Sequence, residues 1–317
     1  MILNQVIEVG ELMGHWAAMA GRTSPLLRKE NRIRTIQASL AIEHNSLTTE
    51  QVTALMEGKR ILAPAKDIQE VRNAILAYEK MSEWKSEKLS DLLQAHRVLM
   101  LGLVDNPGQL RTGNVGVYRE KQLIHMAPPA SQVFRLMNDL LGWLKTTELH
   151  PLIAGAVFHY EFEFIHPFAD GNGRMGRLWQ TLILREWRSE LAWLPVETLI
   201  HYQQDRYYQV LGQCDRQSSC TLFIEFILEN IISALQEGLG KSSALSEEMS
   251  EEMSPDLLDI EKRILQILSN HPGRSAKSIA DECELSARTV ERYLKALQLK
   301  GKLQRVGATK GGMWRVI

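Results

Sequence analysis

The sequence has few cysteines, no long apolar run and no basic leader at its start. Its 317 residues include only three cysteines, too few and too scattered for a disulfide framework or a zinc site. No apolar stretch approaches the roughly 18–20 residues that a membrane-spanning helix needs. The first residues also lack the basic and apolar regions of a secretory signal. These absences exclude disulfide-rich, zinc-binding and membrane-spanning classes, and they predict a protein of the reducing cytoplasm.

An excess of charge of one sign is missing as well. The chain has 37 Lys and Arg residues against 38 Asp and Glu residues, a formal net charge of −1, with 44% hydrophobic and 24% charged residues. This composition is typical of a globular protein. The balanced charge argues at first sight against a nucleic-acid partner. A length of 317 residues predicts about two domains.

Residues 240–256 mark the clearest domain boundary. This stretch is rich in Ser and Glu, repeats the tetrapeptide SEEM and contains no aromatic residue. Because it cannot bury enough apolar surface to order itself, we interpret it as an interdomain linker. It separates residues 1–239 from residues 257–317. Within the first part we distinguish an N-terminal helical segment (1–100) from a core (101–239).

Residues 1–239 show mostly helical periodicity, so the predicted fold class is mainly α. Thr48 and Gln51 form a capping-box pattern, and Ser24 precedes a proline at a first helical position. Residues 109–126 instead predict a short β-hairpin, which ends before Pro128. Further helices are expected at 66–84, 87–101, 131–145, 151–165, 173–188, 200–215 and 219–238.

Residues 257–317 are expected to form three helices followed by two strands around a Gly-rich turn. This order is typical of a winged helix-turn-helix domain. Residues 286–317 contain eight basic residues and one acidic residue, so the neutral total hides a local excess that suits a DNA backbone. A protein-docking role remains an alternative. The candidate DNA-contacting residues on the last of the three helices are Arg288, Thr289, Arg292 and Lys295.

The residues that carry chemistry concentrate at 166–177, HPFADGNGRMGR. Gly171 and Gly173 permit a tight turn that exposes backbone N–H groups at a helix N-terminus, which suits phosphate. Two arginines, Arg174 and Arg177, follow on one helix face and can hold phosphate oxygens bidentately. The loop also holds a hard oxygen ligand for Mg²⁺ and one group that accepts a proton near neutral pH. The pattern predicts a Mg²⁺–nucleotide site with a general base.

This stretch resembles the signature of the Fic (filamentation induced by cAMP) family, HxFx[DE]GNGRxxR, and every fixed position matches. The resemblance implies a helical core with a β-hairpin flap. It also implies transfer of AMP from ATP to a Ser, Thr or Tyr hydroxyl, with release of pyrophosphate. The core at 101–239 then corresponds to the catalytic domain. A related branch that transfers a terminal phosphate has Lys at the place of Gly173, so this glycine favours AMP transfer.

The resemblance implies a role for each residue of the motif. His166 deprotonates the incoming hydroxyl, and Asp170 holds Mg²⁺. Asn172, with the amides of Gly171 and Gly173, grips the α- and β-phosphates. The two arginines hold the β- and γ-phosphates.

The resemblance extends to the flap and to two tyrosines farther along the chain. The flap is expected to dock a segment of the target protein, and self-modification is a second outcome. Residues implied to contact the nucleotide outside the signature are Val115, Gly116, Val117, Tyr118, Tyr207 and Tyr208.

Residues 39–45, SLAIEHN, are similar to the inhibitory motif [ST]xxxE[GN] of the same family. Ser39 and Glu43 are four residues apart and therefore lie on one helix face. The resemblance implies that Glu43 pairs with Arg177 and keeps the γ-phosphate out. His44 replaces the usual glycine or asparagine. In some relatives this glutamate supports AMP removal, so a bifunctional enzyme is an alternative. The surrounding TIQASLAIEHN also resembles a DUF4172-type N-terminal segment.

A second function is compatible with the same sequence. In it the chain is a DNA-binding transcriptional regulator whose Fic domain senses a nucleotide. The intact signature with His166 favours the enzyme, because a sensor needs no general base. The sequence leaves open the target protein and the choice between monomer and homodimer.

Overall fold

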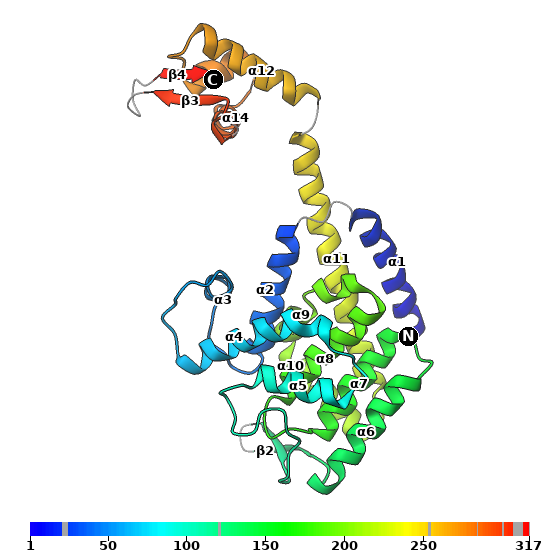
Figure 1. Ribbon diagram of the computed structural model, residues 1–317. Coiled ribbons are helices and arrows are strands. Elements are labelled where there is room, and N and C mark those ends of the chain that lie inside the picture. The colour runs from blue at the N-terminus through cyan, green and yellow to red at the C-terminus, as the bar shows by residue number, and fades with distance from the viewer. Residues whose placement is uncertain are drawn as a thin grey trace. The chain divides into compact units, whose positions relative to one another are not determined.

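The computed structural model describes residues 1–20, 25–119, 122–252, 255–283, 285–299, 301–306 and 313–316. Its two compact units are Met1–Gly240 and Lys241–Ile317. Helices dominate both, which confirms the predicted mainly-α class (Figure 1). Among the described residues, no helix has the length and apolar character that crossing a membrane requires.

The first unit is a helical assembly with one inserted hairpin. Its antiparallel strands, β1 and β2, pair Gly116 with Met126 and shift register at Val117/Tyr118. The elements in chain order are α1 (Ile2–Ala20), α2 (Pro25–Ala41), α3 (Thr49–Met56), α4 (Ala65–Lys80), the short 3-10 helix η1 (Met81–Glu83), α5 (Leu89–Leu99), β1 (Gly116–Arg119), β2 (Gln122–Met126), α6 (Ala130–Thr146), α7 (Pro151–Ile165), α8 (Asn172–Trp187), η2 (Ser189–Trp193), α9 (Val196–Tyr202), α10 (Gln204–Gln217) and α11 (Thr221–Glu252).

Helix α8 lies at the centre of this unit, and every residue from Arg174 to Leu184 is buried along it. It packs against α7, and a hydrophobic cluster lies on each side of this pair. One cluster draws on α2, α4, α5 and α6, the other on α9, α10 and α11. The signature arginines on the first turns of α8, Arg174 and Arg177, are therefore part of the packed interior, whereas Asp170 just before the helix is exposed. Figure 1 shows α8 among the other helices of the first unit.

The local expectations for α2, α3 and the hairpin have different outcomes. Thr48 and Gln51 form the complete capping box of α3. Helix α2 begins at Pro25, whereas Ser24, its expected N-cap, lies outside the described residues. The hairpin is shorter than predicted, because residues 109–115, all of them described, form no strand. The chain before it is tied down by side chains instead, since the Asn114 side-chain carbonyl accepts the Ala130 N–H at 2.9 Å.

Two expectations are wrong in detail. The helix predicted at 200–215 is divided into α9 and α10 at Gln203, where φ is −112° and ψ is 28°. The segment 240–256, predicted to be an unordered linker, continues α11 as helix to Glu252. Its Ala, Leu, Glu, Lys and Met residues are strong helix formers, and extending an existing helix avoids the cost of nucleation.

The second unit has the predicted winged-helix architecture. Its elements are α12 (Pro255–Asn270), α13 (Ala276–Cys283), α14 (Ala287–Leu299), β3 (Leu303–Val306) and β4 (Met313–Val316). The strands pair antiparallel with Leu303 opposite Val316. Ile264, Val290 and Trp314 bring the first helix, the third helix and the wing into one small core.

Candidate functional site

The predicted phosphate loop is a tight connection between α7 and α8. Its first residue, His166, ends α7 in the left-handed conformation, with φ 51° and ψ 60°. Gly171 precedes α8 with φ 85°. A Cβ added at Gly171 would lie 2.7 Å from the Met100 sulfur. Glycine is therefore favoured there by the backbone angle, and any larger residue would also have to displace the Met100 side chain. The loop brings His166, Asp170 and the N-terminus of α8 together, as the sequence predicts.

Asn172 holds this loop together. Its side chain is 2% exposed. Its carbonyl accepts the Phe168 N–H at 2.9 Å, and its amide donates to the Phe168 carbonyl at 2.9 Å. Both ends of the side chain are thus bonded to loop backbone. These bonds shape the loop that presents the amides, and contact of the Asn172 side chain with the phosphates stays a prediction.

His96, which the sequence did not single out, supports the loop from α5. Its Nδ1 accepts the Gly108 N–H at 2.8 Å, so its Nε2 is the protonated nitrogen and donates to the Asp170 carbonyl at 3.0 Å. The ring stacks on Phe168 with centroids 3.7 Å apart. Burial lowers the pKa of His96 to about 4, so the ring is neutral at physiological pH.

Arg111 ties the flap to the catalytic loop and was also missed. Its guanidinium is 6% exposed and donates to the carbonyls of His166 at 2.7 Å, Gly113 at 2.9 Å, Pro128 at 2.6 Å and Ile165 at 3.2 Å. The first and fourth belong to the end of α7, and the other two flank the hairpin. One side chain therefore sets the place of the flap relative to His166.

Arg174 lies in an acidic environment. Its Nη1 is 3.1 Å from Glu70 Oε1, and its Nη2 is 3.3 Å from Asp170 Oδ1. Arg174 and Glu70 are 6% and 5% exposed, whereas Asp170 is 58% exposed. Asp170 is therefore the partner that faces water. A single accessible carboxylate beside a phosphate site fits Mg²⁺, which binds through one or two carboxylates and substrate phosphates.

Arg177 is bound by the segment that the sequence identifies as inhibitory. Its Nη2 is 2.8 Å from Glu43 Oε1 and 2.9 Å from the Ser39 carbonyl, and its Nε donates to Ser39 Oγ at 3.1 Å. A methyl group added at Gly173 would collide with the Glu43 carboxylate. Glu43 therefore lies directly over the N-terminus of α8, where an anion would bind.

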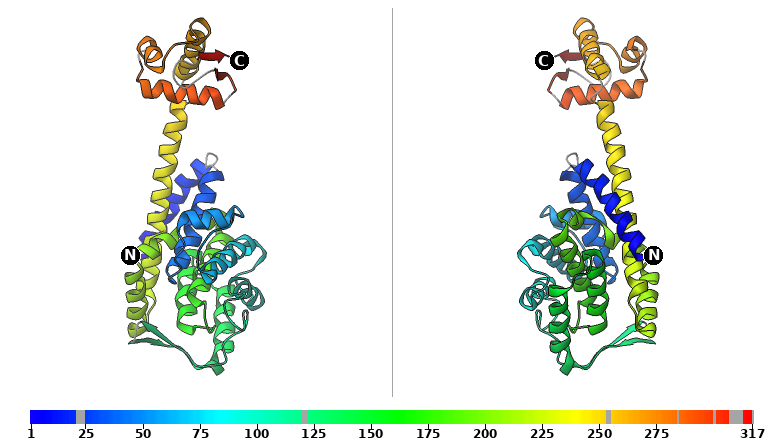
Figure 2. Two further views of the ribbon diagram at one scale, coloured as in Figure 1. Left: turned by 90° about the vertical axis from the view of Figure 1, so that its left-hand side faces the viewer. Right: turned by 90° about the vertical axis from the view of Figure 1, so that its right-hand side faces the viewer.

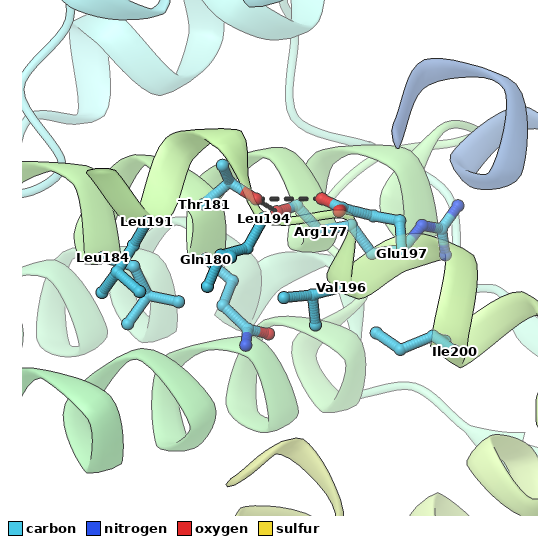
Figure 3. A pocket seen from close by; sticks show the side chains of 9 residues that line it. All are labelled: Arg177, Gln180, Thr181, Leu184, Leu191, Leu194, Val196, Glu197 and Ile200. Atoms are coloured by element: carbon cyan, nitrogen blue, oxygen red, sulfur yellow. Dashed lines mark hydrogen bonds between the residues drawn. The ribbon is translucent and has the colours of Figure 1, made fainter. Parts of the chain in front are cut away.

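Glu197 is a second carboxylate near Arg177. It is 3% exposed, and its Oε1 accepts from the Thr181 hydroxyl at 2.9 Å and from Tyr78 at 3.3 Å. Figure 3 shows Arg177, Thr181 and Glu197 beside a cavity of about 10 Å³, the space of one water. Burial alone would lower the pKa of Arg177, but the nearby charge of Glu43 raises it, so the guanidinium stays charged. Burial raises the pKa of Glu197.

The two tyrosines differ in their surroundings. Tyr207 is 1% exposed, and its hydroxyl is 3.1 Å from His159 Nε2 within the core. Aromatic neighbours enclose its ring, among them Phe223 and Phe226, and its contact with the nucleotide stays a prediction. Tyr208 is only partly buried, and its place in nucleotide binding stays a prediction.

The flap hairpin and α14, the helix with the candidate DNA contacts, are described in part. Val115 and Gly116 are half-buried, whereas the side chains of Val117 and Tyr118 lie outside the described residues. The hairpin lies at one end of the first unit (Figure 2) and its second strand contacts α10.

In α14, Lys295 is exposed and Thr289 is half-buried. The Thr289 hydroxyl is 2.7 Å from that of Ser286, which caps the helix. The side chains of Arg288 and Arg292 lie outside the described residues.

Known proteins resemble the chain in both units. The Fic/DOC family model matches residues 86–184, and a winged helix-turn-helix DNA-binding model matches residues 257–304. The protein adenylyltransferase Fic of Nematostella vectensis is 29% identical over 63% of this chain and 47% of its own length. That of Aedes aegypti is 30% identical over 69% and 44%. The chain thus spans less than half the length of these two relatives.

A solved structure matches along the whole chain. The crystal structure of a Fic family protein from Desulfovibrio desulfuricans G20 superimposes with a TM-score of 0.76 and 45% sequence identity. The match covers 100% of this chain and 95% of the other. Because the two proteins share sequence and fold over nearly their full lengths, the chain belongs to the Fic family.

Proposed function

We propose that this chain is a protein adenylyltransferase, which transfers AMP from ATP to a hydroxyl group of a target protein or of itself. The observation that carries the proposal is the convergence of His166, Asp170 and the N-terminus of α8 in one loop, with Arg174 and Arg177 on the first turns of the helix. The names of the relatives from Nematostella vectensis and Aedes aegypti support it.

The loop is suited to a triphosphate for electrostatic reasons. The helix N-terminus and the backbone amides at 171–173 attract the phosphates, and the two arginines neutralise their charge. Asp170 would hold Mg²⁺, which neutralises charge on the phosphates when it is bound.

His166 then serves as the general base. It accepts the proton of the target hydroxyl while the oxygen attacks the α-phosphorus of ATP. The new O–P bond forms as the bond to the leaving pyrophosphate breaks. Arg111 holds the backbone carbonyl of this histidine and both ends of the flap, so it aligns the base with the docked target. In a two-stranded hairpin each strand keeps an outer edge, on which an extended target segment can pair.

The Glu43–Arg177 pair acts as an internal inhibitor in this proposal. The carboxylate occupies a donor of Arg177 and lies over the phosphate loop, so it both blocks and repels the γ-phosphate. Glu43 is 31% exposed, so it can leave toward water when the inhibition is relieved. AMP removal supported by this glutamate is the alternative reaction at the same site.

Incubation with labelled ATP and Mg²⁺ tests the proposal. The wild type, Glu43→Gly and His166→Ala are compared, each with and without a bacterial lysate as the source of targets. Glu43→Gly should raise the label on protein, and adding His166→Ala to it should abolish the label. Equal labelling of the wild type and Glu43→Gly would refute the proposed inhibition. Labelling that persists after His166→Ala would refute the proposed adenylyltransferase activity of this site.

A second function, a DNA-binding regulator, is favoured by the winged helix-turn-helix match at 257–304 and the excess of basic residues after Ser286. Lys295 is exposed on α14, where a phosphate contact is expected. Binding of labelled duplex DNA to the wild type and Lys295→Glu tests it, with Lys145→Glu in the first unit as the control. Loss of DNA affinity only in Lys295→Glu is the expected result, and salt-insensitive or absent binding would contradict it. The two functions are compatible in one chain.

A cytoplasmic location is part of the same proposal. The three cysteines, all within the described residues, are free thiols, as a reducing compartment would keep them.

A further inference from the structure

We propose that Glu70 is a positioning residue that fixes Arg174 for binding a phosphate group. Glu70 projects from α4, outside the signature loop, and its carboxylate contacts two segments. Its Oε1 is 3.1 Å from Arg174 Nη1, and its Oε2 accepts the Asn45 side-chain amide at 2.8 Å. The inference rests on the proposed function, because it concerns the same phosphate site.

The two signature arginines each face a glutamate, but the two glutamates differ in burial. Glu43 is 31% exposed and lies over the backbone of Gly173, where an anion would bind. Glu70 is 5% exposed and sits inside a regular helix. Glu70 has one other charged neighbour, the exposed Lys66, whose Nζ is 3.9 Å from Oε1, and Arg174 also contacts Asp170. Breaking the ion pair between the two buried groups, Glu70 and Arg174, is nevertheless costly. Glu70 therefore stays with Arg174 when Glu43 leaves.

The contact with Glu70 uses only one corner of the guanidinium. It engages Nη1 and leaves the opposite edge, formed by Nε and Nη2. Nη2 is 3.3 Å from the exposed Asp170, and Nε is buried with no hydrogen-bond partner among the described residues. Two adjacent N–H donors on one edge match two phosphate oxygens. Once Asp170 turns away toward a cation, this edge is available to phosphate.

A fixed counterion matters because arginine is long and flexible. Without Glu70, Nη1 loses its partner and the guanidinium can turn to pair end-on with Asp170 instead. Both groups would then be lost to the nucleotide. The Asn45 amide keeps the Glu70 carboxylate from rotating, since it also donates to the Asp67 carbonyl at 3.2 Å. Glu70 is thus fixed by Asn45 on one carboxylate oxygen and contacts Arg174 with the other.

Titration calorimetry with Mg-ATP tests this inference on the full chain carrying Glu43→Gly and His166→Ala, which removes both inhibitor and turnover. Adding Glu70→Gln should weaken Mg-ATP binding about tenfold or more, the effect expected for losing a charged hydrogen bond. Glu70→Asp keeps the charge and should recover most of that loss. Glu79→Gln is the matched control, because Glu79 lies on the same helix and pairs with Arg32 at the surface, 3.2 Å away.

A second comparison separates positioning from folding. In a chain that also carries Arg174→Ala, Glu70→Gln should change the affinity by less than about twofold, because the residue it positions is gone. A loss of affinity that persists without Arg174 would overturn the inference. The inference would also be overturned if Glu70→Gln bound Mg-ATP as tightly as its parent. Tighter binding would overturn it as well, because it would mean that Glu70 competes with the phosphates for Arg174. Binding is measured without turnover, so a failed adenylyltransferase assay would leave this result readable.

Discussion

Ser39 accepts two hydrogen bonds from the guanidinium that Glu43 neutralises. Arg177 Nε donates to Ser39 Oγ at 3.1 Å, and Arg177 Nη2 donates to the Ser39 carbonyl at 2.9 Å. Ser39 lies in the last turn of α2 and Glu43 in the turn that follows the helix, so the C-terminal end of α2 covers Arg177 from Nε to Nη2. The inhibitory contact is therefore a small network and not a single ion pair.

Replacing Ser39 by alanine should release the inhibition in part. The change removes one hydrogen bond to a charged group and leaves the carboxylate in place, so a loss of about 1.5 kcal/mol is expected. Basal labelling should rise about tenfold, and less than in Glu43→Gly. The rate of AMP transfer from labelled ATP measures it, with Ser90→Ala, an exposed serine, as the control. No change in the rate would show that the hydroxyl plays no part.

His44 ends the turn that follows α2, next to Glu43, and lies in the left-handed region with φ 68°. Its side chain is exposed, so the backbone conformation is the main demand on this position. His44→Val should cost about 1–2 kcal/mol, because a β-branched residue fits this region poorly. The melting temperature should fall and basal AMP transfer should rise. His44→Gly should keep both at the wild-type level or better, and equal behaviour of the two variants would contradict the argument.

Arg111 should matter more for the target than for ATP. Lysine in its place can satisfy only part of the set of carbonyls that Arg111 binds around the flap and His166. We expect Arg111→Lys to raise KM for the target protein several-fold, while the Kd for Mg-ATP changes little, because other side chains hold the phosphate loop. Arg135→Lys is the control, since Arg135 pairs with Asp139 on an exposed helix face. A Kd for Mg-ATP that rises as much as KM would refute a flap-specific role.

The parts of this site that the sequence predicts are those with a local signal. The spacing of His166, Asp170, Arg174 and Arg177 lies within twelve residues, and the capping box of α3 lies within four. Helix periodicity likewise depends on neighbours in the chain, so it identified most elements and the winged helix.

The supporting residues have no such signal. Glu70 and Arg174 are 104 positions apart, and His96 is 74 positions from Asp170. Their burial and pairing arise only when α4 and α5 pack against α8, and an isolated Glu or His in a helix resembles any surface residue. The same reason applies to Tyr207 and Tyr208, because the sequence does not show which of two adjacent tyrosines faces the core.

Two buried histidines make the stability of the first unit depend on pH. Burial lowers the pKa of His96 to about 4 and that of His159 to about 3, both below the usual 6.5. Between the folded-state pKa of each histidine and 6.5, the unfolded chain binds a proton at that histidine and the folded chain does not. The contribution of each neutral histidine is therefore complete above pH 6.5 and is lost as the pH falls toward 4.

The free energy of unfolding should thus fall between pH 7 and pH 5, by up to about 1.4 kcal/mol per pH unit for each histidine. His96→Gln should be less stable at pH 7, because the bonds to Gly108 and Asp170 are altered, yet its stability should depend less steeply on pH. Urea unfolding of the wild type and this variant at both pH values measures the slopes. His15→Gln, at an exposed position, is the control. If the unfolding free energy of His96→Gln depended on pH as steeply as that of the wild type, protonation of His96 would not be the cause of the acid sensitivity.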